Sequence, residues 1–150
     1  MTKLMLVLII GYSIPSYACS CEYSSNMIER FANAEIIFSG KVLSVQYCEL
    51  EKNGPVKLYS IAITNSFKGD NRSTIQLLTG IGDGDCGDDF TIGEDYVIFG
   101  YDARYTVKND GLYETNICMW NILPSEFPRA LEYLSLIKSG KITKENFKNF

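Results

Sequence analysis

Short apolar runs separated by turn residues fill the middle of the chain, and this pattern predicts strands more than helices. The predicted strands span residues 34–47, 57–67, 74–79, 94–102 and 112–118. Gly40 interrupts the first and longest of them, which indicates a bulge or a sharp bend at that point. Glycine, asparagine and aspartate gather between the runs, for example in Lys68-Gly69-Asp70-Asn71 and Lys108-Asn109-Asp110-Gly111, as turns require.

Apolar residues within the second and fourth strands are the predicted core. They are Leu58, Ile61, Ile63 and Phe67 in the second strand, and Tyr96, Val97, Ile98, Phe99 and Tyr101 in the fourth. Two helices flank the strands: a short one over residues 27–32, and a second one capped by Ser125, with Pro128 in its first turn and Gly140 at its end. Five strands, a bent first strand and flanking helices predict a mainly β fold, a small closed barrel.

The first 18 residues have the features of a secretory signal peptide. A basic start at Lys3 precedes an apolar run over residues 4–10, which is too short to span a bilayer. Ser16 and Ala18 place small residues where a signal peptidase cuts, so the mature chain is expected to begin at Cys19. A lipoprotein interpretation stays open because a cysteine follows the cut. The chain thus divides into a leader (1–18) and one domain (19–150), secreted or periplasmic and without stable membrane insertion after cleavage.

Composition and net charge limit the classes of function that the chain can have. Removing the leader leaves 132 residues, enough for one domain with a core, and the loss of Lys3 changes the net charge from −4 to −5. An acidic domain is a poor candidate for binding nucleic acid. The sequence has no histidine, which removes histidine-dependent nucleophiles, general bases and metal ligands. We therefore expect a protein that is not an enzyme and that needs no cofactor and no metal of its own.

Five cysteines follow the leader, an odd number, so at least one thiol is left over if bridges form. They are Cys19, Cys21, Cys48, Cys86 and Cys118. A disulfide within Cys19-Ser20-Cys21 would be strained, so each of its cysteines is better joined to a distant partner, and counting alone cannot choose the pairs. Three interpretations of this C-x-C segment stay open: structural half-cystines, a zinc-chelating terminus and a redox dithiol.

An aspartate-rich loop precedes the fourth strand. Its acidic residues Asp83, Asp85, Asp88 and Asp89 are expected to form a solvated loop, with a calcium site as the alternative. Asn71-Arg72-Ser73 matches the acceptor string for N-glycosylation, a string that is common by chance.

Several short strings in a fixed order resemble the netrin-like domain and, within it, the tissue inhibitors of metalloproteinases. They are Cys19-Ser20-Cys21, residues 34–42, Phe67-Lys68-Gly69, Cys86-Gly87, residues 93–97 and Ile117-Cys118, so the resemblance covers residues 19–140. It implies an OB-like five-stranded barrel with helices packed against it. It also implies two disulfides, Cys19 with Cys86 and Cys21 with Cys118. Cys48 has no clear counterpart in the family pattern, so we expect a buried free thiol there, with an intermolecular or reactive thiol as the alternative.

The resemblance further implies a function for the mature N-terminus. The α-amine and carbonyl oxygen of Cys19 would chelate the catalytic zinc of a metalloprotease, and Ser20 would enter its specificity pocket. Cys21 and the loop residues Asp83, Gly84 and Asp85 would also contact the protease. The alternative is a netrin-like binding module that inhibits nothing and recognises another protein of the cell envelope or extracellular space, with purely structural disulfides.

Overall fold

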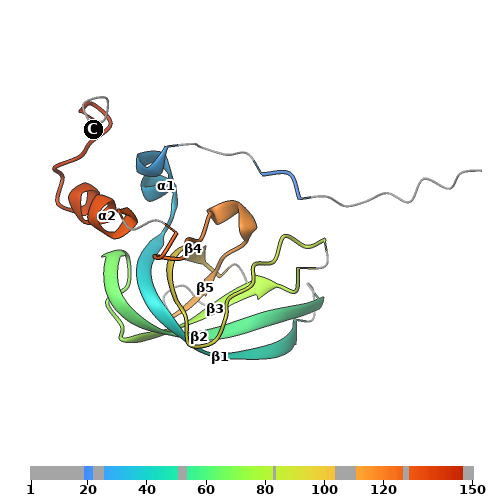
Figure 1. Ribbon diagram of the computed structural model, residues 1–150. Coiled ribbons are helices and arrows are strands. Elements are labelled where there is room, and N and C mark those ends of the chain that lie inside the picture. The colour runs from blue at the N-terminus through green and yellow to red at the C-terminus, as the bar shows by residue number, and fades with distance from the viewer. Residues whose placement is uncertain are drawn as a thin grey trace, which may run out of the picture.

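The computed structural model describes residues 19–21, 26–50, 54–82, 84–103, 111–126 and 129–146, which form one five-stranded sheet and two short α-helices. The elements are α1 (Met27–Asn33), β1 (Ile36–Leu50), β2 (Gly54–Lys68), β3 (Thr74–Gly80), β4 (Asp95–Asp102), β5 (Leu112–Glu114), the 3₁₀ helix η1 (Ile117–Met119) and α2 (Ala130–Lys138). Figure 1 shows the strands curving around one another with both helices at one side. The prediction of a mainly β fold is confirmed. The predicted leader and the turn at residues 108–110 lie outside the described residues.

Strand pairing runs in the order β1-β2-β3-β5-β4 and returns from β4 to β1. All pairs are antiparallel except β3 with β5. The register between β1 and β2 shifts at Gly40, where a Cβ atom would lie only 2.5 Å from the carbonyl oxygen of Ala62. The predicted bulge at Gly40 is therefore confirmed, and the glycine is needed because the neighbouring backbone comes so close.

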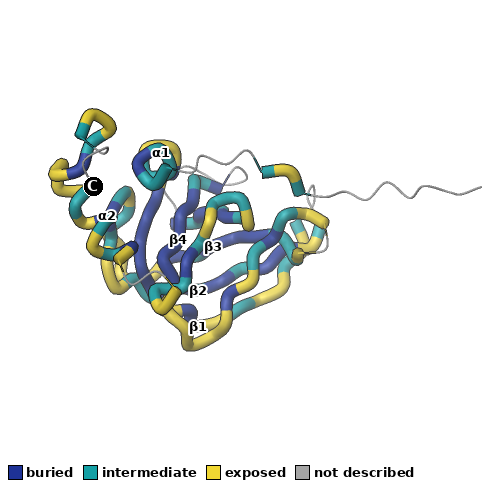
Figure 2. The backbone as a smooth tube through the Cα atoms, turned by 45° about the horizontal axis from the view of Figure 1, so that its top comes forward, coloured by how far each residue is buried: buried dark blue, intermediate teal, exposed yellow. Residues whose placement is uncertain are grey.

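The start of β1 (residues 36–40) and the middle of β4 (residues 96–100) are buried on both faces, which explains why apolar residues follow one another there. Ile36, Phe38 and Ile98 point into a cluster enclosed by the strands. Ile37 and Phe99, on the opposite face, pack in a second cluster with residues of both helices, including Phe31 and Leu134. Figure 2 shows the buried residues concentrated along these strands. Phe99 is fully buried, as predicted, whereas Leu58, Ile63 and Tyr101 are only half-buried.

The two helices begin differently from one another. Asn26 caps α1 because its side-chain oxygen accepts a 2.9 Å hydrogen bond from the backbone N–H of Ile28. The prediction that Ser125 caps the second helix is wrong, since α2 begins only at Ala130. A turn precedes the helix instead, in which the backbone N–H of Glu126 donates to the carbonyl of Leu123.

Neither α-helix in the described ranges has the length and apolar character that a membrane span requires.

The fifth strand is shorter than the pattern predicted, because it ends at Glu114 and Cys118 lies in η1. The Asn116 side chain ends the strand by accepting a 2.9 Å hydrogen bond from the backbone N–H of Cys118. This local bond competes with sheet pairing, as short polar side chains often do.

Candidate functional site

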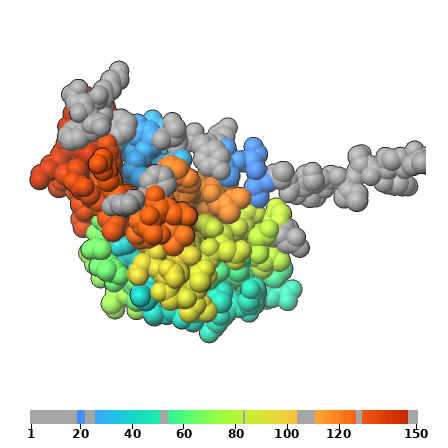
Figure 3. Space-filling view, in the orientation of Figure 1, coloured from blue at the N-terminus to red at the C-terminus, as the bar shows by residue number. Residues whose placement is uncertain are grey.

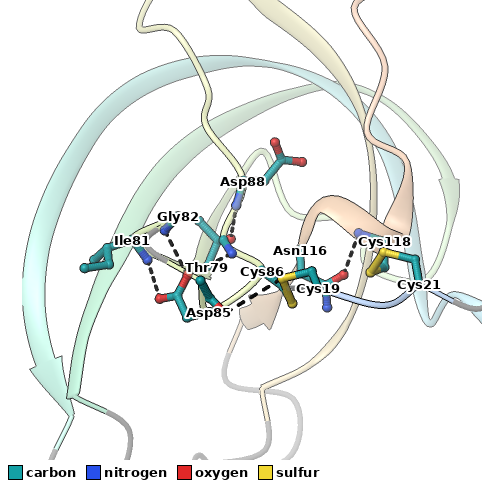
Figure 4. Close-up of a disulfide and its surroundings, with 12 residues drawn as sticks. Cys19, Cys21, Thr79, Ile81, Gly82, Asp85, Cys86, Asp88, Asn116 and Cys118 are labelled. Carbon is teal, nitrogen blue, oxygen red and sulfur yellow. Dashed lines mark hydrogen bonds between the residues drawn. A yellow bond between two sulfur atoms is a disulfide. The ribbon is translucent and has the colours of Figure 1, made fainter. Parts of the chain in front are cut away.

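The C-x-C segment is joined to the rest of the protein at both cysteines. Cys19 is bonded to Cys86, with their Cα atoms 5.5 Å apart, and Cys21 is bonded to Cys118, with their Cα atoms 5.3 Å apart (Figure 4). These are the pairs that the family resemblance implied. Ser20 between them is exposed. The segment is thus fixed at two points that lie far along the chain.

The fifth cysteine, Cys48, is unpaired and half-buried on β1. It packs at the edge of a small apolar cluster formed by Val56, Leu78 and Ala103. The thiol is free, as expected, but it is half-buried and not fully buried.

Asp85 organises the loop that carries Cys86. Its carboxylate accepts hydrogen bonds from the backbone N–H groups of Ile81, Gly82 and Gly87, at 2.7, 2.8 and 3.0 Å (Figure 4). Burial would raise the pKa of this carboxyl, but the backbone donors Gly82, Gly87 and Ile81 outweigh it and the pKa is lowered. Asp85 is exposed, as expected of a solvated loop, but its carboxylate also fixes the loop backbone by accepting these three hydrogen bonds.

Asp88 connects the same loop to two other parts of the fold. Its backbone N–H donates to the Thr79 hydroxyl at 2.8 Å, and its carboxylate accepts a 2.8 Å hydrogen bond from the amide of Asn121. The Asn121 amide also donates to the Thr115 hydroxyl at 2.9 Å, and its oxygen accepts from the N–H of Phe99. This network fixes the C-terminal side of the Cys86 loop against β3 and, through Asn121, against β4.

Lys57 on β2 also holds the loop that carries Cys86, through an ion pair with Asp89 that the sequence pattern did not predict. Only 2% of its side chain is exposed, and its Nζ lies 2.5 Å from a carboxylate oxygen of Asp89, a residue whose own side chain is 83% exposed. A buried ammonium group is costly unless it is paired, so the Asp89 carboxylate is the partner that makes this position tolerable. Leu58, which was predicted as a core residue, is more exposed than the neighbouring Lys57.

The segment after β5 is hydrogen-bonded to the loop that carries Cys86. The backbone N–H of Ile117 donates a 3.0 Å hydrogen bond to the carbonyl of Cys86. Cys86 and Trp120 have φ angles of 63° and 62°, and they are the only non-glycine residues in the described part of the chain with positive φ. Such a conformation costs about 1–3 kcal/mol per residue and persists where the surroundings enforce it.

The predicted site residues are brought together as far as they are described. Gly84 is exposed, and its carbonyl oxygen lies 3.9 Å from the Cys19 sulfur, so the Cys86 loop and the C-x-C segment form one ridge, defined here as Cys19, Ser20, Cys21, Gly84, Asp85 and Cys86. Asp83 lies outside the described residues. The described part of the chain holds no cluster of three or more cysteine or acidic side chains arranged to bind a metal, so no calcium site is found there.

Sequence reasoning missed Asn121, Lys57 and the left-handed backbone at Trp120. Only Lys57 carried a signal, as a charged residue inside a run of strand formers. No protein-family model matches the chain, and a search of curated proteins finds no match.

Proposed function

We propose that this chain is a secreted protein similar to the tissue inhibitors of metalloproteinases, and that its mature N-terminus at Cys19 inhibits a zinc metalloprotease. The observation that carries the proposal is the double attachment of the C-x-C segment through Cys86 and Cys118. The cyclic strand order β1-β2-β3-β5-β4 supports an OB-like closed barrel as the scaffold.

The chemistry needs only the terminal residue. After cleavage at Ala18, the α-amine and carbonyl oxygen of Cys19 belong to one residue and can chelate a metal together. An α-amine titrates near pH 7.7–8.0, so the neutral form that zinc binds is accessible at physiological pH. Catalytic zinc keeps one coordination position open for water or substrate, and the amine would displace that water. Ser20, which is exposed, would then face the specificity pocket of the protease.

The fixed ridge lowers the cost of binding. A free terminus would have to be ordered when it enters a protease cleft, at about 0.5–1.5 kcal/mol for each flexible side chain. Here the disulfides to Cys86 and Cys118 order the terminus beforehand, and the Asp85 and Asp88 hydrogen bonds hold the Cys86 loop.

The second candidate is a binding module that inhibits no protease. The observation that favours it is the exposure of acidic side chains, Asp85 and Asp89, next to Cys86. Acidic groups on the ridge and beside it would suit a basic partner, whereas a protease cleft must tolerate them. In this case the two disulfides are structural only, and the partner is another envelope or extracellular protein.

One added residue separates the two candidates. The protein starting at Cys19 and a form with one extra alanine before Cys19 are tested against a panel of zinc metalloproteases. The inhibitor proposal predicts inhibition by the first form and none by the second, because the added residue moves the amine away from Cys19. Equal inhibition by both forms, or no inhibition by either, contradicts it. Circular dichroism checks that both forms are folded.

A further inference from the structure

Two large apolar side chains are exposed beside the Cys21–Cys118 disulfide. Ile117 is 41% exposed and Trp120 is 38% exposed, and they flank Cys118 within η1 and at its end. The stretch from Asn116 to Asn121 carries no charged residue, in contrast to the acidic chain around it. Figure 3 shows residues 111–126, in orange, reaching the blue surface of residues 19–21.

The backbone that carries these side chains is fixed on both sides. Ile117 N–H donates to the carbonyl of Cys86, and Cys118 is bonded to Cys21. Directly after Trp120 and Asn121, Ile122 exchanges two backbone hydrogen bonds with Val97, of 2.7 and 2.9 Å. Ile117 and Trp120 therefore belong to the same rigid unit as the ridge and keep a constant position relative to Cys19.

The indole of Trp120 is also held in place. The guanidinium carbon of Arg30 lies 3.9 Å from the ring centroid, so a cation from α1 covers one face of the ring. More than a third of the residue nevertheless stays exposed, in the left-handed backbone conformation with φ 62° and ψ 54°. An ordered, partly exposed tryptophan loses little entropy on binding, and tryptophan is among the residues that most often dominate the energy of protein interfaces.

We propose that Ile117 and Trp120 are an apolar anchor that packs against the uncharged rim of the protease cleft whose zinc is bound by Cys19. This inference rests on the proposed inhibitory function, and it names the second contact of the same interface. The anchor is continuous with the ridge through the Ile117–Cys86 hydrogen bond and the Cys21–Cys118 bridge. The partner surface is thereby specified as apolar opposite Ile117 and Trp120, next to a catalytic metal, with a group at its edge that tolerates the Arg30 cation.

The chain has a single tryptophan, which makes Trp120 its own reporter. The protein is prepared with fluorotryptophan and mixed with an unlabelled zinc protease that it inhibits, so that fluorine NMR observes Trp120 alone. We expect the resonance to move on binding and to lose most of its shift between water and heavy water. Trp120→Ala should raise the inhibition constant about 10- to 100-fold. Ile92→Ala, the control at a 56% exposed apolar position before β4, should change it less than about twofold.

The outcomes separate the two proposals. If the unmodified protein inhibits but the fluorine resonance stays unchanged and folded Trp120→Ala inhibits equally well, the anchor is wrong and the inhibitor proposal stands. If no protease in the panel is inhibited, both are overturned. Because the NMR measurement needs no substitution, it decides the matter even if Trp120→Ala fails to fold.

Discussion

The backbone N–H of Ile117 donates a 3.0 Å hydrogen bond to the carbonyl oxygen of Cys86, 31 positions earlier in the chain. Each residue lies at or next to a cysteine bonded to the C-x-C segment, so this one bond ties the two disulfide-bearing loops directly together. The segments of the ridge are therefore held rigidly together. Residues that do not contact a partner should contribute to the stability of the ridge.

The disulfide pairing gives a first prediction. Peptide mapping without reduction should find Cys19 linked to Cys86 and Cys21 linked to Cys118, with Cys48 as the one free thiol. The double variant Cys21→Ser/Cys118→Ser should lose about 4 kcal/mol of unfolding free energy, because that bridge closes a long loop. Urea unfolding measures the loss. A major peptide that links Cys48 to another cysteine would contradict the pairing.

The Asp85 carboxylate should contribute to stability despite its exposure. Asp85→Ala leaves three backbone donors without their acceptor, so we expect a loss of about 1–3 kcal/mol in urea unfolding at pH 7. Asp95→Ala is the matched control, because Asp95 makes only an exposed 3.6 Å ion pair with Lys41, worth about 0–1 kcal/mol.

The same side chain should give the protein an acid-dependent component of stability. The pKa of Asp85 is lowered in the folded state, so its contribution is complete above about pH 4 and is lost as the pH falls through the folded value. Asp85→Ala should therefore show a smaller loss of stability on acidification than the parent protein. Parallel curves for the two proteins would mean that the three backbone hydrogen bonds do not favour the charged form.

Tyr113 should make stability depend on alkaline pH. Burial, together with donation of the phenol to Asp70 at 3.0 Å, raises the pKa of Tyr113 to about 12 from an ordinary value of 10.0. The folded protein thus holds the proton more tightly than the unfolded chain. The stabilising effect is complete below pH 10 and is lost as the pH rises to about 12.

Tyr113→Phe tests this dependence. At pH 8 it should cost about 1 kcal/mol, for the lost hydrogen bond. Between pH 10 and about 12 its stability should fall less steeply than that of the parent protein, by on the order of 2 kcal/mol in total. The measurement is the urea midpoint across this range, and identical slopes would refute the prediction.

Phe99 tests the packing between the sheet and the helices. The ring is fully buried among residues of β1, β2 and both helices, so Phe99→Ala should cost about 3–5 kcal/mol. A cost below about 1 kcal/mol would place the ring in solvent and the register of β4 one residue off.

The parts of the fold that were predictable are those governed by local pattern. The apolar runs located all five strands, because buried strands consist of consecutive or alternating apolar residues. Gly40 marked the bulge, because a close backbone approach there leaves no room for a side chain. One missed feature depends on a residue distant in sequence, and another depends on a local side chain. Lys57 is buried because Asp89 reaches it from 32 positions away. The early end of β5 depends on Asn116 capping η1, and a single side-chain bond of this kind is hard to distinguish from ordinary strand sequence.

The candidate site shows the same division. The family resemblance supplied the disulfide pairs, which the cysteine count could not choose. The hydrogen bonds that hold the Cys86 loop could not be predicted. Asn121 donates to Asp88 and Thr115, and nothing in the sequence around these polar residues indicates that they meet. The left-handed conformations of Cys86 and Trp120 also lack the glycine or asparagine that would have signalled them.

The most direct test of the central claim is the inhibition of a zinc metalloprotease panel by the protein that starts at Cys19, compared with the same protein acetylated at its terminal amine. Acetylation removes the lone pair that the zinc must accept and leaves both disulfides in place. We expect that micromolar unmodified protein slows at least one protease and that the acetylated protein does not. Equal inhibition by both forms, or no inhibition by the unmodified form, would contradict zinc chelation by Cys19.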